Sequence, residues 1–540
     1  MFFSVFCTNS LFTAVYLQRF IYSASMKKNI AFLFCFASLA FCYAQTGGET
    51  KSFYNNRPAF HFTPPKNWIN DPNGLVYLNK EYHLFYQYNP FGNKWGHMSW
   101  AHAVSKDLQT WKSLPLALKE YKTSDTTEAW IFSGCVVVDS LNSSGFFKKG
   151  KKNGMVAVFT SAVHSATRDV AQNQSLAYST DYGRNWKYYA KNPVLDNNST
   201  NFRDPNVFWY PNTKKWIMAV NKPLEYTVQF YESVNLKNWK LLSEFGKQGD
   251  TSRVWECPSL FEVPIEGMKK TKWVLLISSG HRQKNYLGMQ YFVGDFDGKT
   301  FVPQKQPEIF YLDEGKDFYA AIPFGNLPNT EKKPIILGWL NDWEYAGDIP
   351  TGSVFRGAFS VPRTLSLFNE GGIYKITQQP KIDYGLTTKS STTWAENRVI
   401  DSSTEINTTF TKNLLAESYH LQLKIENINA EGFNLEILKS GDEKTLISYN
   451  FSTKKLSLDR TKSGNVDFNA RFKSIETMEV PLEDNKLTLD IHVDKWIVEI
   501  FAGGGKKALT DIVFPTKHDS KIDLVPFKGK IKVNSLRIYP

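Results

Sequence analysis

Apolar and polar residues alternate in short runs along most of the chain, and this two-residue period is typical of β-strands with one buried face. Clear examples are residues 154–161, 215–220 and 272–278. No segment after residue 44 shows a strong 3.6-residue period, so we expect no substantial helix there. The pattern predicts an all-β protein.

A polar turn followed by an aromatic residue recurs after several of these runs. A unit of two strands, a turn and an aromatic residue, repeated about every 50–75 residues, is typical of β-propeller blades. With the strand at 335–339 and N-terminal strands closing the ring, the repeats predict five blades around a central funnel. We expect the tryptophans of the repeats to have a structural packing role. The copies are SKDLQTWK (105–112), STDYGRNWK (179–187), SVNLKNWK (233–240) and, more loosely, GDFDGKTF (294–301).

The pattern changes after about Leu367, where short alternating strands separated by turn-rich segments dominate. Strands at this spacing predict a β-sandwich. Gln378, Gln379 and Pro380 have the composition of a linker. We therefore expect a propeller over 50–370, a linker over 371–385 and a sandwich over 386–540.

The first 44 residues do not resemble a part of the fold. From Met26 the chain has two lysines, an apolar run over 30–41 and small residues before a cut after Ala44, which is the pattern of a secretory signal peptide. We expect translation to start at Met26 and residues 1–25 to be an upstream extension. The sequence predicts a secreted or periplasmic protein, and a lipid anchor at Cys42 is disfavoured by the bulky Phe41 before it.

The composition narrows the class of protein further. The 540 residues are enough for two domains, and aromatic residues make up 15% of them, which suits β-rich folds and sugar-binding clefts. The net charge of +12 is scattered and no nucleic-acid-binding motif accompanies it, so we expect no nucleic-acid partner. The apolar run of the leader is too short to span a membrane. Only Cys135 and Cys257 follow the leader, which excludes a disulfide framework but leaves their pairing open.

Three acidic motifs are the candidates for catalysis. Asp71 lies in WINDPNG, Asp204 in RDP and Glu256 in WECP. Taken singly, the first two also fit an ordinary turn and a surface ion pair, and the third fits a solvent-facing strand glutamate. We expect the neighbours of Glu256 to desolvate it, which would raise its pKa and suit it to proton donation. Hydrolysis of a glycosidic bond needs two such carboxyl groups beside the bond.

Together these motifs resemble glycoside hydrolase family 32, the group of invertases, inulinases and levanases. The resemblance runs from about Pro58 to the C-terminus, with the motifs in the family's order. They are PAFHFTPPKNWINDPNG (58–74), LFYQYNPFGNKWGHMSWAHAVSKDLQTW (84–111), WIFSG (130–134), FRDP (202–205), WECP (255–258), DFYAA (317–321), GWLNDW (338–343) and DKWIVEIFAGGG (494–505).

The resemblance implies a role for each carboxylate. Asp71 is expected to be the nucleophile, Glu256 the general acid/base, and Asp204 a transition-state stabiliser. Retention of configuration is implied, for which the reacting carboxyls lie roughly 5–5.5 Å apart, and no metal or organic cofactor is expected. The implied substrate contacts are Asn70, Gln87, Trp95, Phe132, Ser133, Arg203, Tyr319 and Trp339.

The sequence thus predicts a secreted hydrolase of β-fructofuranosyl linkages. We expect exo-action on a fructan, levan or inulin, with sucrose as a further candidate. A fructosyltransferase with the same carboxylates remains an alternative, because the motifs do not distinguish water from a sugar acceptor. A non-catalytic fructan-binding protein is the third alternative, but it would be expected to lack Asp71 or Glu256. The oligomeric state is left open.

Overall fold

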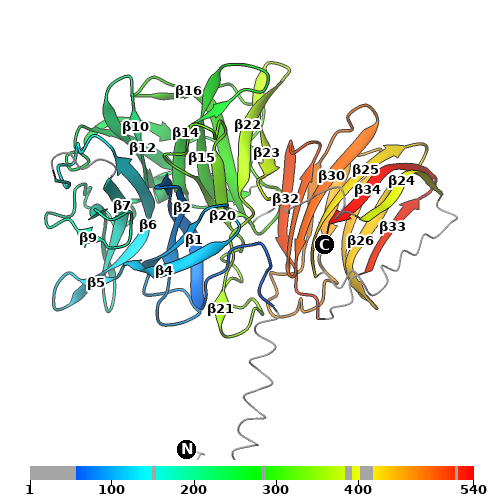
Figure 1. Cartoon of the computed structure of the whole chain (residues 1–540), viewed down its shortest axis with the longest axis horizontal. Helices are drawn as coiled ribbons and strands as arrows, with labels where there is room; N and C mark the ends of the chain where they lie inside the picture. The colour runs from blue at the N-terminus through cyan, green and yellow to red at the C-terminus, as the bar shows by residue number, and fades with distance from the viewer. Residues whose placement is uncertain are drawn as a thin grey trace, which may run out of the picture. The chain divides into compact units, whose positions relative to one another are not determined.

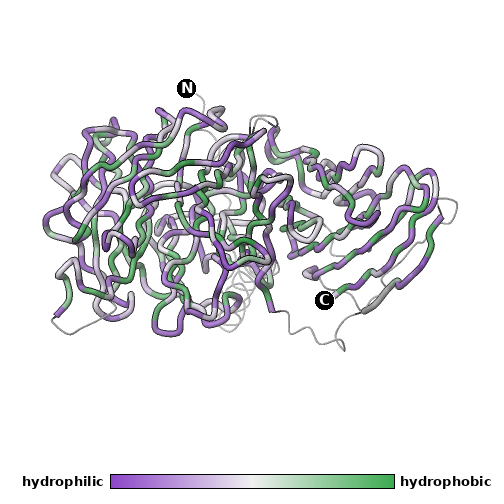
Figure 2. The backbone as a smooth tube through the Cα atoms, turned by 90° about the horizontal axis from the view of Figure 1, so that it is seen from above, coloured by the Kyte–Doolittle hydropathy of each residue, from purple (hydrophilic) through white to green (hydrophobic). Residues whose placement is uncertain are grey.

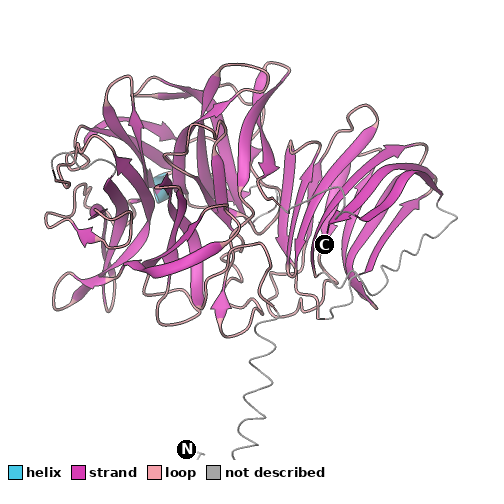
Figure 3. Ribbon diagram, viewed as in Figure 1, coloured by secondary structure: helices cyan, strands magenta, loops and turns pink. Residues whose placement is uncertain are grey.

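The computed structural model describes residues 56–148, 154–281, 284, 286–383, 392–401, 417–516 and 521–539, and strands make up nearly all of its regular structure (Figure 3). The predicted leader, residues 1–44, lies outside the described residues. Within the described part of the chain, no helix is long and apolar enough to cross a membrane. The predicted five-bladed propeller and C-terminal sandwich are confirmed (Figure 1).

The first blade contains the strand pairing that closes the ring. Asn67 and Trp68 of β1 pair in parallel with Phe355 and Arg356 of β21, which lies in the fifth-blade segment of the sequence. The last blade is therefore joined to the first by hydrogen bonds. The strands of this sheet are β21 (Phe355–Arg356), β1 (Asn67–Leu78), β2 (Glu81–Tyr88), β3 (Ser99–Ser105) and β4 (Trp111–Leu118).

The other four blades are antiparallel sheets that follow in chain order. The second contains β5 (Tyr121–Lys122), β6 (Thr127–Asp139), β7 (Gly154–Ser165), β8 (Asp169–Ser179) and β9 (Lys187–Tyr188). The third contains β10 (Arg203–Tyr210), β11 (Lys215–Lys222), β12 (Thr227–Ser233) and β13 (Lys240–Gly246), with the 3-10 helix η2 (Pro223–Glu225) between β11 and β12. The fourth contains β14 (Glu256–Pro264), β15 (Thr271–His281), β16 (Tyr286–Phe296), β17 (Phe301–Pro303) and β18 (Phe310–Tyr311), and the fifth β19 (Tyr319–Pro323), β20 (Ile335–Trp339), β22 (Arg363–Glu370) and β23 (Ile373–Pro380). The hairpin of β22 and β23 thus reaches into the range expected for the linker.

The repeated sequence turns have one structural place. Each connects a blade's last inner strand to the outermost strand that follows it, as between β3 and β4 or β12 and β13. The tryptophan of the turn donates its indole N–H to a carbonyl three residues earlier and packs against a blade core. This contact agrees with the structural role expected for Trp111, Trp186 and Trp239.

Five strands line the centre of the propeller. β1, β6, β10, β14 and β19 contact one another in that order, and β19 contacts β1 again. Each carries a β-bulge, an extra residue relative to its antiparallel neighbour, and these five bulges fall at 70–71, 132–133, 204–205, 257–258 and 320–321. β1 has a second bulge at 74–75. A bulge bends a strand and redirects a side chain. The five-fold repetition therefore directs side chains from every blade to the centre.

Two sheets form the sandwich, and Figure 2 shows hydrophilic and hydrophobic residues alternating along its strands. Leucine, isoleucine and valine side chains from both sheets fill the space between them. One sheet has the order β24 (Thr392–Asp401), β34 (Lys530–Tyr539), β25 (Ser418–Asn427), β30 (Lys486–Asp494), β31 (Ile497–Ala502) and β32 (Lys507–Ile512). The other has the order β29 (Ile475–Glu479), β28 (Lys455–Asp459), β27 (Glu443–Asn450), β26 (Gly432–Ser440) and β33 (Lys521–Phe527).

Buried ion pairs join the propeller to the sandwich. His61, ahead of β1, binds Asp494 through Nδ1 and Glu499 through Nε2, both at 2.9 Å. Arg363 of β22 donates to Glu499 at 2.6 Å and to Asp313 at 2.8 Å. All five side chains are essentially inaccessible to solvent. The two domains therefore share a charged interface as well as apolar contacts.

Candidate active site

The centre of the propeller contains a cavity of about 670 Å³. The innermost strands of the first four blades, β1, β6, β10 and β14, all contribute to its lining. The neighbouring strands β2, β7 and β8 contribute the other strand residues. Its walls carry the three predicted carboxylates, a fourth from Asp169, one arginine and several aromatic rings. The sequence-predicted residues among its lining are Asn70, Asp71, Gln87, Trp95, Phe132, Ser133, Arg203, Asp204 and Glu256.

The central bulges explain why the carboxylates meet. Asp71, Asp204 and Cys257 lie in the bulges of β1, β10 and β14, and each is followed by proline. Proline has no N–H and is tolerated in a strand where the ladder is interrupted. Asp204 and Cys257 also have positive φ angles, 66° and 48°, an uncommon conformation for non-glycine residues. The Asp-Pro and Cys-Pro pairs are thus the local sequence signal of the bulges.

Asp71 is held by three side chains. It accepts hydrogen bonds from Asn70 at 3.1 Å, from the Ser133 hydroxyl at 2.5 Å and from the Cys257 thiol at 3.6 Å. Burial raises the pKa of Asp71, repulsion from Glu256 adds to this, and the bonds from Ser133 and Asn70 only partly offset it. The carboxylate is therefore fixed in position by three groups that carry no positive charge.

Asp204 is fixed mainly by backbone contacts. Its N–H donates to Thr160 at 3.0 Å, and its carboxylate accepts the Cys257 N–H at 3.0 Å. Burial raises the pKa of Asp204 above its ordinary value, and the nearby Arg203, 4.0 Å away, opposes that shift. This carboxylate faces the cavity with its side chain almost fully buried.

Glu256 has the strongest polar partners of the three. Arg203 donates to its Oε1 from Nε at 3.2 Å and from Nη2 at 3.0 Å, while the Tyr319 hydroxyl donates to Oε2 at 2.8 Å. The side chain of Glu256 keeps 23% of its surface exposed. The desolvation expected from its sequence neighbours is therefore only partial, because Trp255 is buried in the blade core while Glu256 faces the cavity.

Two predicted contacts differ from the rest. Tyr319 binds Glu256 but is not among the residues that line the cavity. Trp339, at the end of β20, is fully buried behind Trp343, with their ring centroids 4.7 Å apart. Trp343 itself lines the cavity and is 38% exposed. The chain turns after β20, and this turn presents the second tryptophan of the GWLNDW motif to the cavity.

Several lining residues were missed by sequence reasoning. Trp130 and Trp343 lie inside motifs that were recognised, so their aromatic character was an available signal. Gln172 and Asn201 accept from Arg203 Nη1 at 3.3 and 3.5 Å, and no sequence pattern marks them. His164 and Asp169, from the second blade, also line the cavity. Cys135 and Cys257 are both free and buried.

Two groups of described side chains have the spacing of metal ligands, and neither includes the three carboxylates. They are His97 with Glu120 and Glu128, and His420 with Asp490 and His492. The central cavity instead combines paired carboxyls with aromatic rings, the combination that glycosidic bond cleavage uses. The fold and site together define a propeller-type glycosidase.

Comparison with known families gives a specific assignment. The model described as "Glycosyl hydrolases family 32 N-terminal domain" matches residues 61–380, and "Glycosyl hydrolases family 32 C terminal" matches residues 385–540. The chain belongs to glycosyl hydrolases family 32.

Named relatives cover most of the chain. A levanase of Bacillus subtilis is 40% identical over 95% of this chain and 75% of the relative. The extracellular exo-inulinase of Aspergillus niger is 38% identical over 88% of this chain and 92% of its own length. The crystal structure of the exo-inulinase from Aspergillus awamori superimposes with a TM-score of 0.81 at 36% identity, covering 89% of this chain and 97% of that one.

Proposed function

We propose that this chain is a secreted, retaining exo-hydrolase that removes terminal fructose units from levan or inulin, with sucrose as a further substrate. The convergence of Asp71, Asp204 and Glu256 on one cavity is the observation that carries this proposal. A retaining mechanism needs one carboxylate as nucleophile and a second carboxyl as acid and then base. Membership of family 32 and the names of the relatives support the choice of β-fructofuranosyl linkages.

Asp71 is the nucleophile of the proposed mechanism. The bonds from Asn70 and Ser133 orient its carboxylate and stabilise its ionised form. It attacks the anomeric carbon of the terminal fructosyl unit and forms a covalent ester as the glycosidic bond breaks. The departing oxygen takes a proton from Glu256.

Glu256 is the acid and base because its carboxyl group is fixed and still reachable. Arg203 and Tyr319 orient it from two sides, and the exposed part of the side chain faces the cavity through which water enters. In the second step Glu256 takes a proton from water, which attacks the anomeric carbon. Free fructose leaves and Asp71 regains its charge.

Asp204 stabilises the fructosyl unit during both steps. Its carboxylate is locked by the Cys257 N–H and directed into the cavity, where it can accept hydrogen bonds from sugar hydroxyls. A negative group here also stabilises the positive charge of an oxocarbenium-like transition state. In the proposed mechanism, Asp204 neither donates nor accepts a proton.

The cavity and its rim support action at a chain end. Its volume of about 670 Å³ lies within the range of small-ligand sites. Trp95 and Trp343 on the rim are 47% and 38% exposed, so their rings are available to stack on sugar. A polymer is too large to import, which favours an exported enzyme.

A product profile tests the function. Purified residues 45–540 are incubated with levan, inulin and sucrose, beside Asp71→Asn as the inactive control. Free fructose from a polymer, absent with the variant, is the expected result. Longer oligosaccharides in place of fructose would establish the fructosyltransferase alternative, and no product from any substrate would overturn the proposal.

Two further properties are part of the proposal. Retention predicts that the first fructose released has the β configuration, which NMR detects before mutarotation. Export predicts that expression of the full chain yields a processed protein that begins after Ala44, which mass spectrometry of the N-terminal peptide detects. An unprocessed protein inside the cell would contradict the proposed secretion.

A further inference from the structure

The sandwich carries a His-Asp-His group that the proposed reaction does not use. His420 lies on β25 directly opposite His492 on the neighbouring β30, and Asp490 precedes His492 by two residues. Residues two apart lie on the same face of a strand. The residues that alternate with the group along both strands belong to the sandwich core, so the group lies on the outer face of the sheet. These core residues are Leu421, Leu423, Leu489 and Ile491.

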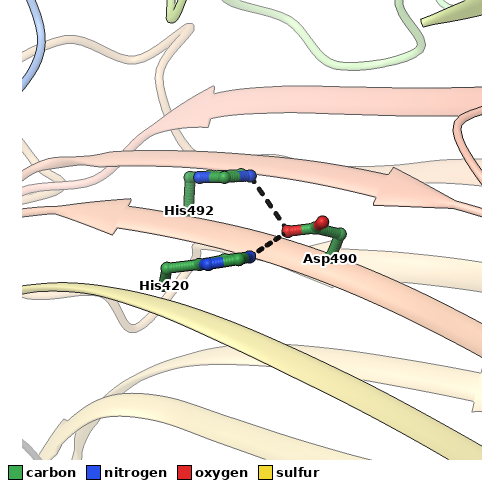
Figure 4. A group of neighbouring side chains, drawn as sticks. All are labelled: His420, Asp490 and His492. Carbon is green, nitrogen blue, oxygen red and sulfur yellow. Dashed lines mark hydrogen bonds and ion pairs between the residues drawn. The ribbon is translucent and has the colours of Figure 1, made fainter. Parts of the chain in front are cut away.

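The donor atoms of this group lie close together. The two imidazole rings are stacked, with centroids 4.5 Å apart and an interplanar angle of 7°. Nε2 of His420 and Nε2 of His492 both contact the same oxygen of Asp490, the latter at 3.0 Å (Figure 4). Every pair of ligand atoms lies within 4.8 Å.

The two rings are buried, whereas the carboxylate is partly exposed. His420 and His492 are 6% and 1% exposed, whereas the side chain of Asp490 is 31% exposed. Tyr539 stacks on His420 at 5.3 Å, and Phe501 packs edge-on against His492 at 5.6 Å. Packing thus keeps the two nitrogens side by side, and solvent reaches the group from the side of Asp490.

The ligand types select a class of ion. Two imidazole nitrogens and one carboxylate form a three-ligand protein set that leaves a fourth position for water, as in zinc sites. Calcium and magnesium prefer oxygen ligands.

We propose that His420, Asp490 and His492 bind one divalent transition-metal ion of the zinc type. The ion takes the place beside both Nε2 atoms that the Asp490 oxygen now occupies, and Asp490 moves outward by the length of a metal–oxygen bond, about 2 Å. The two rings lose their Nε2 protons and turn so that both nitrogens face the ion. Bound there, it links β25 to β30 at the middle of the six-stranded sheet. The site is structural, because none of its residues lines the catalytic cavity.

Calorimetric titration with zinc chloride tests the proposal. The full chain is used without a histidine tag, after chelator treatment and dialysis. One equivalent of Zn²⁺ is expected to bind to the wild type. Loss of a residue that only orients a metal ligand typically weakens binding by roughly 10–100-fold. Loss of a ligand itself, in Asp490→Asn or His492→Gln, should therefore weaken binding more than about 100-fold.

His97→Gln is the matched control, because His97 belongs to the other described group with metal-ligand spacing. It should bind Zn²⁺ as the wild type does. Asp490→Asn preserves shape at a partly exposed position, so it tests the site without relying on a buried replacement. Zn²⁺ should raise the thermal midpoint of the wild type and of His97→Gln, but not that of Asp490→Asn.

Three results would overturn the site. One is a wild type that binds no stoichiometric Zn²⁺. Another is equal affinity in the wild type and Asp490→Asn. A third is loss of binding in His97→Gln, which would place the ion on the propeller. Fructose release measures a different property and should be unchanged in Asp490→Asn, so failure of the metal site and failure of the proposed function are distinguishable.

Discussion

Buried carboxylates occur in two regions of this molecule, and their surroundings have opposite effects on them. In the central cavity, Asp71, Asp204 and Glu256 share a single arginine, Arg203. Burial and mutual repulsion raise the pKa of Asp71 and of Asp204. The cavity therefore carries an excess of negative charge that the protein itself does not neutralise.

At the interface of the two domains, positive partners outweigh the same cost of burial. Arg363 and His61 flank Glu499, and although burial opposes it, their charges lower the pKa of Glu499 to about 2. Burial also opposes ionisation of Asp494, but His61 and backbone N–H groups of the segment ahead of β1 lower the pKa of Asp494. Complete pairing makes these carboxylates structural, whereas incomplete pairing leaves those of the cavity available for chemistry.

The largest effect is expected for Asp71→Asn. The amide cannot act as nucleophile, so kcat should fall by roughly 10⁴–10⁶-fold. Because one of three crowded negative charges is removed, the thermal midpoint should stay equal or rise. Initial rates on sucrose or inulin and a thermal melt check both parts. Strong destabilisation would show that the cavity is not electrostatically crowded.

The opposite result is expected for Arg363→Met at the interface. Removing the arginine leaves Glu499 and Asp313 without their shared partner, which should cost about 3–5 kcal/mol of unfolding free energy. The kcat of the folded fraction should be nearly unchanged. Denaturant unfolding measures the loss, and Lys272→Met, which breaks the exposed pair with Asp295, should cost less than about 1 kcal/mol. Equal losses in the two variants would contradict the comparison.

A pH effect of intermediate size is expected from His61. Burial lowers its pKa, but the bonds with Asp494 and Glu499 outweigh burial and raise it from 6.5 to about 9. The stability that the protonated ring contributes is therefore complete below about pH 6.5 and is lost as the pH rises to about 9. His61→Gln should abolish this decline, on the order of 2 kcal/mol. Melts over pH 6–9 measure it, with the exposed His97→Gln as control; an unaltered slope in His61→Gln would exclude the assignment.

The smallest effect is expected for Ser133→Ala. Its hydroxyl bond lowers the pKa of Asp71, so removal of the hydroxyl should raise that pKa. Since the nucleophile must be ionised, the acidic limb of the kcat/KM profile should move to higher pH. Ser133→Thr, which keeps the hydroxyl, should restore the position of the limb. Lower activity without any shift would limit Ser133 to a steric role.

Much of the fold could be predicted because its signals are local. The repeated turns fix blade boundaries through contacts within four residues, such as the Trp111 indole bond to Leu108. The alternating strands after Leu367 predict the sandwich for the same reason. The end of the propeller was harder to predict, because β23 differs little in sequence from a polar linker and is defined by its pairing with β22.

The site was predictable where one short motif carries both the bulge and the side chain. Asp71, Asp204 and Glu256 all belong to such motifs, and all line the cavity. Gln172 was missed because its contact with Arg203 spans 31 residues and joins two blades. Trp339 was expected at the cavity but is buried, and Trp343 lines the cavity instead. Only the turn after β20 decides which of the two rings faces the cavity.

The sequence by itself determined the strands, the repeated turns, the bulge-forming proline motifs and the three acidic residues. These depend on interactions among residues close in the chain, which a linear pattern records. Only the tertiary structure decided that Arg203 and Tyr319 hold Glu256, that His61 and Arg363 neutralise Glu499, and that His420 meets His492. Those outcomes depend on which strands become neighbours, because pairing and pKa are set by distance in space and not by distance along the chain.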